Sequence, residues 1–338
     1  MALKHNNLKR ILHRSFEELK ASYDVAKSIS IKAAYITLRA KIDIQIMNRN
    51  GMKEPDDVKR RLLSKHKIML DFLDKKYSNY WDKYQFSKDI KDSNPKYHNK
   101  IWVCWWQGLD NAPDIVKACI KTIKANSEGA EVILITDDNY KNYISFPDYV
   151  EEKRKKGLIS RTIFSDLLRL NLLSTYGGIW IDSTFFCVHS NFDSYMKLPI
   201  WSIKRPEYGH CSVACGYFAN YSLGCSYQYR WAYKVVLDFL YNYWKENNKL
   251  IDYLLTDYAI VLSQKHIAEV SELFSGIQPN NPNCDELVKV LNEPFDETKW
   301  NMLKNETGLF KLTWKQEFSS SANGQRTFYA MIIDGTLR

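Results

Sequence analysis

The feature that most constrains the fold is an alternation of short apolar runs with helical patterns, which begins after Pro95. Residues 101–106 form a β-like run, and a helical pattern follows Pro113. Residues 131–136 form a second β-like run, and helical patterns then continue to Thr175. Strands that alternate with helices in this way are typical of α/β domains. The sequence therefore predicts an α/β fold.

The second half of the chain continues this pattern less regularly. Two further strands and two long helices are expected after Asp182, at residues 199–204, 212–219, 227–247 and 251–269. The tail from Asn280 is rich in loops and contains one apolar run at residues 309–314. We interpret residues 96–338 as one domain.

The first 95 residues predict helices only. Apolar side chains recur at spacings of three and four from about Leu8 to Met47, which is typical of an amphipathic helix. Pro55 opens a second helix, because proline suits the first helical turn. Residues 1–95 are therefore expected to form a helical region outside the α/β domain.

The composition indicates a folded chain. Apolar residues make up 45% of the 338 residues, which is enough for a large core and excludes disorder along the whole chain. No apolar run reaches the roughly 20 residues that a membrane-spanning helix needs. Residues 1–14 lack the apolar stretch of a secretory signal, so a cytoplasmic location is expected. The seven cysteines are expected to be free thiols, because an odd number in apolar surroundings fits a reducing compartment.

The positive charge is concentrated in the first third. Residues 1–100 carry 23 Lys and Arg against 12 Asp and Glu, whereas the remainder carries 25 against 27. We expect this segment to attach the protein peripherally to an anionic membrane surface, at the inner face of the plasma membrane. The alternative is that its helices pack on the α/β domain or on a second subunit, in a homo-oligomer. Nucleic acid is not expected as a partner, because no nucleic-acid-binding motif appears.

One stretch places charged side chains in apolar surroundings. Asp166 and Arg169 lie three residues apart, on one face of a predicted helix, and need partners if they are buried. They either form an ion pair with each other or point toward a polyhydroxylated ligand. Gly177 and Gly178 end this helix, and glycine allows the backbone there to approach another strand or a ligand closely.

Asp182 directly follows the short apolar strand at residues 179–181. Open α/β sheets bind ligands at the carboxyl ends of their strands. A carboxylate at that place suits Mg²⁺ or Mn²⁺ bridging a diphosphate, while an aspartate in a turn or helix cap is the alternative. Combined with Asp166, Arg169 and the glycine pair, Asp182 predicts a nucleotide-sugar site.

The chain resembles the capsular polysaccharide synthesis proteins, which are related to DXD-type sugar-binding glycosyltransferases of the GT-A fold. The resemblance rests on residues 101–108, on Pro113 with Ile115, Val116 and Cys119, on the helix from Ser165 to Arg169, and on Tyr176 to Asp182. Weaker likeness at residues 252–253, 257–258, 291–296 and 311–315 extends it to about residue 316. It implies a GT-A-like, Rossmann-type domain that binds a nucleotide sugar. Residues 1–95 lie outside it.

The resemblance also implies a donor pocket, with a UDP-sugar as the donor. The nucleoside would lie against the loops that follow the first two strands, and the sugar against the Asp166 helix. The implied donor-binding residues are Trp106, Gln107, Gly108, Asp137, Asn139, Asp166, Arg169, Gly177, Gly178, Ser183, Thr184, His210, Lys311, Trp314 and Lys315. Asp182 is the implied metal ligand.

The DXD pattern departs from the family here, because it reads Asp182-Ser183-Thr184 and a hydroxyl replaces the second carboxylate. One carboxylate neutralises less charge than two. Mn²⁺ or Mg²⁺ would therefore be held weakly, supplemented from elsewhere or replaced by basic side chains. The candidates for that replacement are Lys311, Lys315 and His210. We expect a divalent cation to stimulate activity.

The activity implied is a sugar transfer that retains anomeric configuration, onto a lipid-linked capsular or surface polysaccharide. Front-face attack by the acceptor and a covalent carboxylate intermediate both remain open. Asp182, Asp252 and Asp257 are the expected catalytic carboxylates. Asp252 and Asp257 lie five residues apart, so at most one points into the site. The missing second carboxylate motivates an alternative, a catalytically silent protein that binds sugar nucleotide or scaffolds a synthesis complex.

Overall fold

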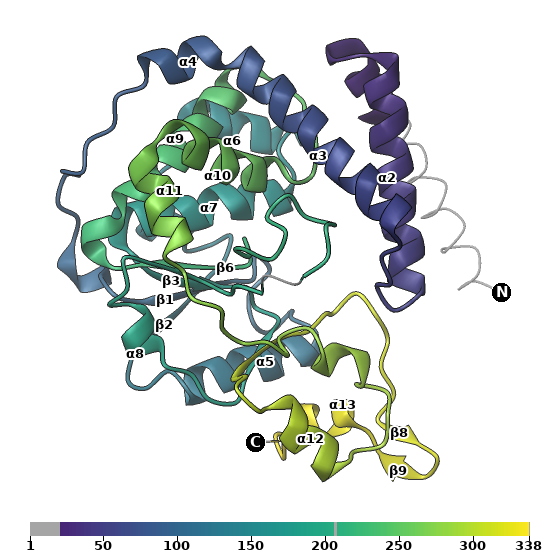
Figure 1. Ribbon diagram of the computed structural model, residues 1–338. Coiled ribbons are helices and arrows are strands. Elements are labelled where there is room, and N and C mark those ends of the chain that lie inside the picture. The colour runs from purple at the N-terminus through teal and green to yellow at the C-terminus, as the bar shows by residue number, and fades with distance from the viewer. Residues whose placement is uncertain (1–20, 206–207, 338) are drawn as a thin grey trace.

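A five-stranded sheet forms the centre of the computed structural model, which describes residues 21–205 and 208–337 (Figure 1). The strand order is β2-β1-β3-β6-β5. Strands β2, β1 and β3 are parallel, β6 is antiparallel to β3, and β5 is antiparallel to β6. This sheet with its helices agrees with the predicted α/β class. The strands span Ile101–Cys104 (β1), Val132–Ile135 (β2), Gly178–Ile181 (β3), Ile200–Ser202 (β5) and Ser222–Cys225 (β6).

The chain changes direction between β1 and β3. It leaves β1 through helix α5 (Asp114–Ala125) to β2 on one side, and returns through α6 (Asp148–Lys155) and α7 (Arg161–Tyr176) to β3 on the other. The backbone continues the pairing beyond the strands, because the Trp105 N–H donates to Ile135 O at 3.0 Å. The gap between the carboxyl ends of β1 and β3 is therefore the switch point at which open α/β sheets bind ligands.

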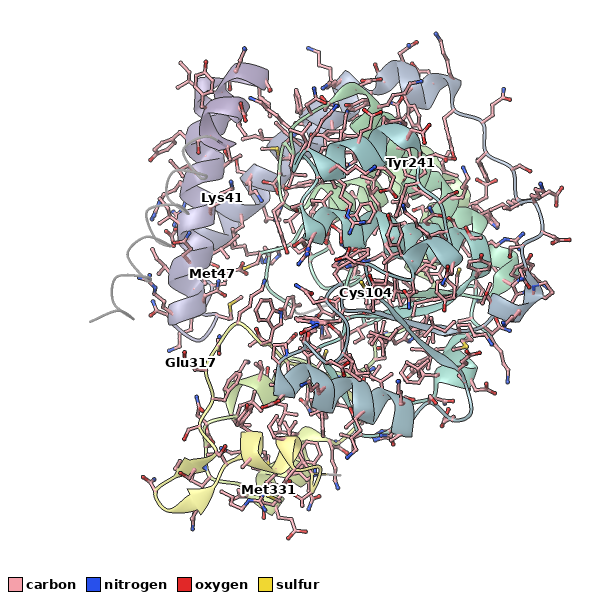
Figure 2. The ribbon with its side chains drawn as sticks, turned by 180° about the vertical axis from the view of Figure 1, so that it is seen from behind. Lys41, Met47, Cys104, Tyr241, Glu317 and Met331 are labelled. Atoms are coloured by element: carbon pink, nitrogen blue, oxygen red, sulfur yellow. The ribbon has the colours of Figure 1, made fainter. Side chains whose placement is uncertain are left out.

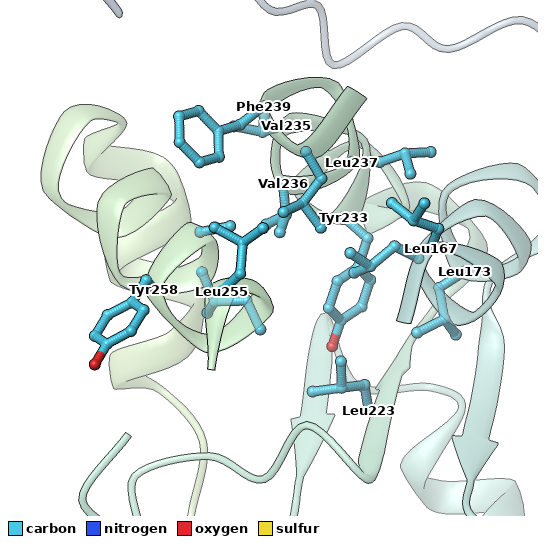
Figure 3. Close-up of a cluster of buried hydrophobic side chains, with 14 of the residues drawn as sticks. Leu167, Leu173, Leu223, Tyr233, Val235, Val236, Leu237, Phe239, Leu255 and Tyr258 are labelled. Atoms are coloured by element: carbon cyan, nitrogen blue, oxygen red, sulfur yellow. The ribbon is translucent and has the colours of Figure 1, made fainter. Parts of the chain in front are cut away.

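Successive residues of β1 and β3 place their side chains alternately in two apolar cores, one on each face of the sheet. Trp102 and Trp180 pack in a cluster with side chains of α7 and α9 (Trp231–Glu246), whereas Ile101 and Ile179 pack in a second cluster with α5. Figure 3 shows part of the first cluster, where Leu167 and Leu223 lie near side chains of α9. The period of two along a strand explains this division. Both faces of the sheet are therefore covered, and its carboxyl edge is where functional side chains can gather.

Glycine is required at both positions between α7 and β3, because their φ angles are positive and neighbouring backbone leaves no room for a Cβ atom. Gly177 and Gly178 have φ angles of 66° and 85°. A Cβ on Gly178 would lie 2.3 Å from Lys100 O, and one on Gly177 would lie 3.0 Å from Cys225 O. Of the two alternatives, close approach to a strand is therefore the one that the structure shows.

The N-terminal helices pack on the sheet domain. Residues 21–28 are helical, and α2 (Ile31–Arg49), α3 (Asp56–Lys76) and α4 (Ser78–Lys83) follow. The single helix predicted up to Met47 is interrupted before α2, where the Ser30 side chain accepts the Ala33 N–H at 3.1 Å. Apolar side chains of α3, of α4 and of Tyr77 between them enter the same core as α9 and α10 (Leu255–His266): Met69, Leu73, Tyr77 and Trp81. The part of the predicted stripe before residue 21 lies outside the described residues, and the boundary near residue 95 stays a prediction.

The strand predicted at residues 212–219 is wrong. That segment forms turns, and β6 begins only at Ser222. Cys215 and Gly216 have φ angles of 46° and 79°, which no strand accommodates. The Gly216 carbonyl also accepts the Arg205 N–H at 2.6 Å, so the segment folds back on the loop after β5.

Of the remaining elements, α12, α13, β8 and β9 lie beyond α5, away from the central sheet (Figure 1). A second sheet pairs β4 with β7, and a third pairs β8 with β9. The helix predicted at residues 251–269 is two helices, α10 and α11. In the described ranges, no helix combines the length and the apolar character needed to cross a membrane. The elements not yet given span Phe185–Cys187 (β4), Phe192–Tyr195 (α8), Ala268–Ser275 (α11), Glu297–Leu303 (α12), Leu309–Lys311 (β7), Ser321–Ala322 (β8), Gln325–Arg326 (β9) and Phe328–Ile333 (α13).

Candidate active site

Asp182 lies at the switch point, directly after β3, with 30% of its side chain exposed. Its Oδ1 accepts the indole N–H of Trp180 at 3.1 Å and lies 3.5 Å from Nη2 of Arg169. Its Oδ2 lies 3.5 Å from Nζ of Lys311, which also donates to the hydroxyl of Thr184. Two cations therefore flank one partly open carboxylate.

Arg169 and Asp166 extend this group into the interior. The Arg169 Nη2 lies 3.1 Å from Asp166 Oδ1, so the two side chains do form the intrahelical ion pair that was one alternative. Asp166 also accepts hydrogen bonds from Asn220 at 3.3 Å and Thr256 at 3.1 Å. Arg169 also contacts Asp182, which follows β3. The ion pair on α7 is therefore connected to the carboxyl edge of the sheet.

Asp257 joins the cluster from α10. Its Oδ1 accepts the Ser212 hydroxyl at 3.0 Å. Burial raises the pKa of Asp257 to about 7, and the negative charge of Asp166 adds to the shift, while Ser212 and Arg169 oppose it. Burial likewise raises the pKa of Asp166. Near neutral pH, Asp257 therefore exchanges between its protonated and ionised forms.

The loops after β1 and β2 are held together beside this cluster. The Asp137 N–H donates to Trp106 O at 2.9 Å, and the Trp106 indole donates to the Ser165 hydroxyl at 2.7 Å. Arg154 forms an ion pair with Asp137 and lies 4.9 Å from the centre of the Trp106 ring. Trp106 and Asp137 are thus positioned near the switch point, with their side chains already paired within the protein.

Exposed aromatic side chains border the same edge. Trp314, which follows β7, meets Trp105 edge to face with ring centroids 5.6 Å apart. Tyr253 is largely exposed. Partial burial of its phenol raises the pKa of Tyr253, and the charges of Asp166 and Asp182 add to that shift. Flat rings at the mouth of a polar cluster suit the apolar faces of sugars and the planes of bases.

A comparison with family models matches residues 49–332 to the model described as "Capsular polysaccharide synthesis protein". The chain belongs to the capsular polysaccharide synthesis protein family. The match covers more than half of the chain, and it begins about fifty residues before the segment that carries the sequence resemblance, so it includes α3. No curated protein and no solved structure matches the chain.

Two predicted site residues of this capsular polysaccharide synthesis protein lie apart from Asp182. Both oxygens of Asp252 lie 3.1 Å from Nζ of Lys65 on α3, and both side chains are at most 3% exposed. The ring Nδ1 of His210 lies 2.8 Å from Glu54, and its carbonyl accepts the Nε2–H of His66 at 2.9 Å. Asp252 and His210 thus hold the N-terminal helices against the sheet domain, and the contacts that the described residues give them do not include Asp182.

Other predicted residues have local structural roles. The Asn139 side chain accepts the Thr136 N–H at 2.8 Å and donates to Leu134 O at 2.9 Å, which closes the turn after β2. Gly108 turns the chain after β1 with a φ angle of 79°, and Gln107 beside it is exposed. Lys315 is exposed after β7. Of the three basic candidates, Lys311 is the one that the structure brings to Asp182.

The donor set at Asp182 fits a divalent cation poorly. Its carboxylate oxygens already face Arg169, Trp180 and Lys311. Ser183 and Thr184 supply hydroxyls, which are weaker ligands than carboxylates for a hard cation. Within residues 21–205 and 208–337, no cluster of three or more His, Cys, Asp or Glu side chains is arranged to hold a metal ion. The ammonium of Lys311 lies where the motif side chains Asp182 and Thr184 converge.

Sequence reasoning missed several partners of the cluster: Ser212, Asn220, Tyr253 and Thr256. Ser212 lies in the segment mistaken for a strand. Tyr253 and Thr256 stand beside the two aspartates that were considered, but a hydroxyl without a charge gives no signal in a single sequence. Asn220 enters through a loop, and its place is set by the pairing of β3 with β6.

Proposed function

We propose that this protein is a GT-A-like glycosyltransferase that moves a sugar from a nucleotide-sugar donor, a UDP-sugar, to a lipid-linked capsular or surface polysaccharide. The family membership supports a role in polysaccharide synthesis. The observation that carries the finer proposal is the position of Asp182, at the switch point between β1 and β3, flanked by the cations of Arg169 and Lys311. A diphosphate is the anionic part of such a donor, and cations at a strand end suit it.

The proposed reaction places charge where these cations lie. The bond between the anomeric carbon and the diphosphate breaks, its electron pair leaves with the diphosphate, and the acceptor oxygen bonds to the same carbon. In front-face attack, the acceptor proton passes to the departing phosphate oxygen. In the covalent route, a carboxylate bonds to the anomeric carbon as the diphosphate leaves, and the acceptor oxygen then displaces that carboxylate while its proton passes to another carboxylate. Both routes have an oxocarbenium-like transition state, so stabilisation of the leaving charge is the largest contribution expected.

Each residue of the cluster has a proposed task. Asp182 holds the Lys311 ammonium and the Arg169 guanidinium, which face the diphosphate. Asp166 fixes Arg169 through their 3.1 Å ion pair. Asp257, whose pKa is about 7, is the carboxyl group that can accept or return a proton near neutrality. Trp105 and Trp314 provide ring faces for the base or a sugar.

We further propose that Lys311 takes the role for which the sequence predicted Mn²⁺ or Mg²⁺. Of the three alternatives left by the sequence, replacement by a basic side chain agrees best with the contacts at Asp182. Activity is then expected to persist in excess EDTA, while Lys311→Met lowers the rate by about 100-fold. Paramagnetic resonance of Mn²⁺ titrated into the free protein reports metal binding without an activity assay. Loss of activity in EDTA with recovery on Mn²⁺, or tight Mn²⁺ binding by the unmodified protein, contradicts this assignment.

A second candidate function is binding without turnover. It is favoured by the missing second carboxylate and by the engagement of both Asp182 oxygens. Calorimetric titration with a panel of nucleotide sugars, run beside a donor-hydrolysis assay, separates the two functions. Binding with slow hydrolysis supports the transferase, whereas binding with no hydrolysis and no transfer to saccharide acceptors supports the silent protein.

A further inference from the structure

Helix α2 has apolar side chains on two opposite faces. Its inner face packs on α3, where Ala40, Met47 and Leu62 form a small buried cluster. Asp43 is the sole acidic residue of α2, and it is buried on the same side. Its carboxylate lies 2.6 Å from Nε of Arg61 and 3.2 Å from Nη2 of Arg39. The inner face is therefore fixed by both packing and charge.

The outer face of α2 carries large apolar side chains that remain exposed. Ile31 is 83% exposed, Tyr35 70%, Ile42 41% and Ile46 45%. At a helical repeat of 3.6 residues per turn, these four positions fall within about 60° of one another, so they form one stripe along the helix. We call these four side chains the outer stripe. A helix that is apolar on both sides normally has both sides covered.

Basic side chains accompany the outer stripe. Lys32 and Arg49 are exposed on α2, and Arg39 is partly exposed beside its ion pair with Asp43. No exposed acidic residue lies within α2, because its one aspartate is buried. The stripe ends next to a hollow of 510 Å³ that is lined by Ile46, Met47, Asn50, Pro55 and Val58, by Lys53, and by Asp43, whose charge Arg39 and Arg61 neutralise. Apolar side chains together with cations suit a surface that is both apolar and anionic.

Within residues 21–205 and 208–337, the outer stripe of α2 stays exposed. In Figures 1 and 2 the helix lies at the edge of the molecule, beyond α3 and away from the sheet. Met47 and Lys41, labelled in Figure 2, mark its course. A helix of 19 residues is about 28 Å long, which is enough to lie along a bilayer surface without entering it.

We propose that the outer stripe of α2 docks on an anionic lipid surface, with its axis in the plane of the interface. The apolar side chains would enter the headgroup region, while Lys32 and Arg49 would face anionic headgroups. This inference specifies the face by which the basic N-terminal third attaches. It is independent of the proposed chemistry at Asp182.

A second copy of the chain is a less suitable occupant. In a symmetric dimer through this face, Lys32, Arg39 and Arg49 of one copy would lie against the same cations of the other. Exposed acidic side chains that could compensate are absent from α2. Like charges that face each other across an interface oppose association. Charge complementarity therefore favours an anionic surface over self-association.

The test is co-sedimentation of the full chain with vesicles of phosphatidylcholine, with and without phosphatidylglycerol. We expect salt-sensitive binding to the anionic vesicles only. Ile42→Ser with Ile46→Ser is expected to lower the partition coefficient by about tenfold or more. The matched control is Leu198→Ser with Met302→Ser, which changes two exposed apolar residues outside α2 and is expected to bind like the unmodified protein.

Two controls distinguish loss of lipid binding from loss of folding. Circular dichroism establishes whether the α2 variant is folded, and Lys32→Glu with Arg49→Glu tests the same face through charge alone. The proposal is overturned if the unmodified protein does not bind, or if it binds phosphatidylcholine equally well. It is also overturned if both folded α2 variants bind normally, or if light scattering shows a dimer that the Ile42 and Ile46 changes dissociate.

Discussion

Two buried carboxylates, those of Asp252 and Asp257, lie five residues apart and differ in whether a cation pairs with them. We call the buried pair of Asp252 with Lys65 the closed pair, and the group of Asp257, Asp166, Arg169 and Asp182 the open cluster. At Asp252, one lysine contacts both carboxylate oxygens, and the pair is sealed from solvent. At Asp257, five residues later, no cation of the described residues forms an ion pair with the carboxylate, and burial raises its pKa to about 7. The third carboxylate, that of Asp182, is flanked by two cations but remains partly exposed. The closed pair serves the fold, and the open cluster is available to a ligand.

The largest effect is expected from breaking the closed pair. Lys65→Met leaves Asp252 buried without its cation, which is expected to lower the free energy of unfolding by about 3–5 kcal/mol. Denaturant unfolding measures this change. Lys65→Met combined with Asp252→Leu removes both charges and is expected to recover most of the loss. If the single variant is as stable as the unmodified protein, then the pair does not hold α3 to α10.

The next effect concerns activity. Asp182→Asn is expected to lower the transfer rate by about 100-fold or more, because it releases the two cations that, in the proposed function, stabilise the leaving group. Its stability is expected to change little, since Asp182 is partly exposed. Asp193→Asn, an exposed aspartate paired with Lys197, is the matched control and is expected to be fully active. A folded Asp182→Asn protein with normal turnover would remove Asp182 from the chemistry.

The sequence predicted the sheet and the site to different degrees. Apolar runs located β1, β2 and β3 to within two residues, because buried parallel strands are almost continuously apolar. The same logic failed at residues 212–219, where positive φ angles at Cys215 and Gly216 break an apolar segment into turns. Asp166, Arg169 and Asp182 stood out because charge is rare in an apolar run, and the structure brings them together.

Long-range partners could not be predicted from the sequence. Lys65 precedes Asp252 by 187 positions, and nothing local distinguishes it from the exposed lysines of α3. For the same reason Asp252 and Asp257 were indistinguishable before their surroundings were known. Pairing across the fold decides which carboxylate is neutralised, and a single sequence carries no signal for that pairing.

A smaller effect is expected at the intrahelical pair. Asp166→Leu with Arg169→Leu removes both charges but leaves the Thr256 and Asn220 donors without an acceptor, so a stability loss of about 1–3 kcal/mol is expected. Calorimetry with a UDP-sugar is expected to show at least about tenfold weaker binding, because the variant lacks the guanidinium that we propose binds the diphosphate. A double variant that binds the donor normally would show that the pair is purely structural.

The last expected effect is a pH dependence of stability, which tests whether the carboxyl group of Asp257 differs from that of Asp252. The folded-state pKa of Asp257 is about 7, above its ordinary value of 3.8, so the folded protein holds a proton that the unfolded chain has released. The stability that this proton provides is fully present below about pH 4 and is lost as the pH rises toward 7.

Asp257→Asn retains an acceptor for Ser212 but cannot ionise. It is therefore expected to be more stable than the unmodified protein at pH 8 and to show a flatter pH dependence of the melting temperature. If the carboxyl group also exchanges a proton during transfer, the same variant is less active while being more stable. Equal pH profiles for the two proteins would show that Asp257 is neutralised by a partner, as Asp252 is.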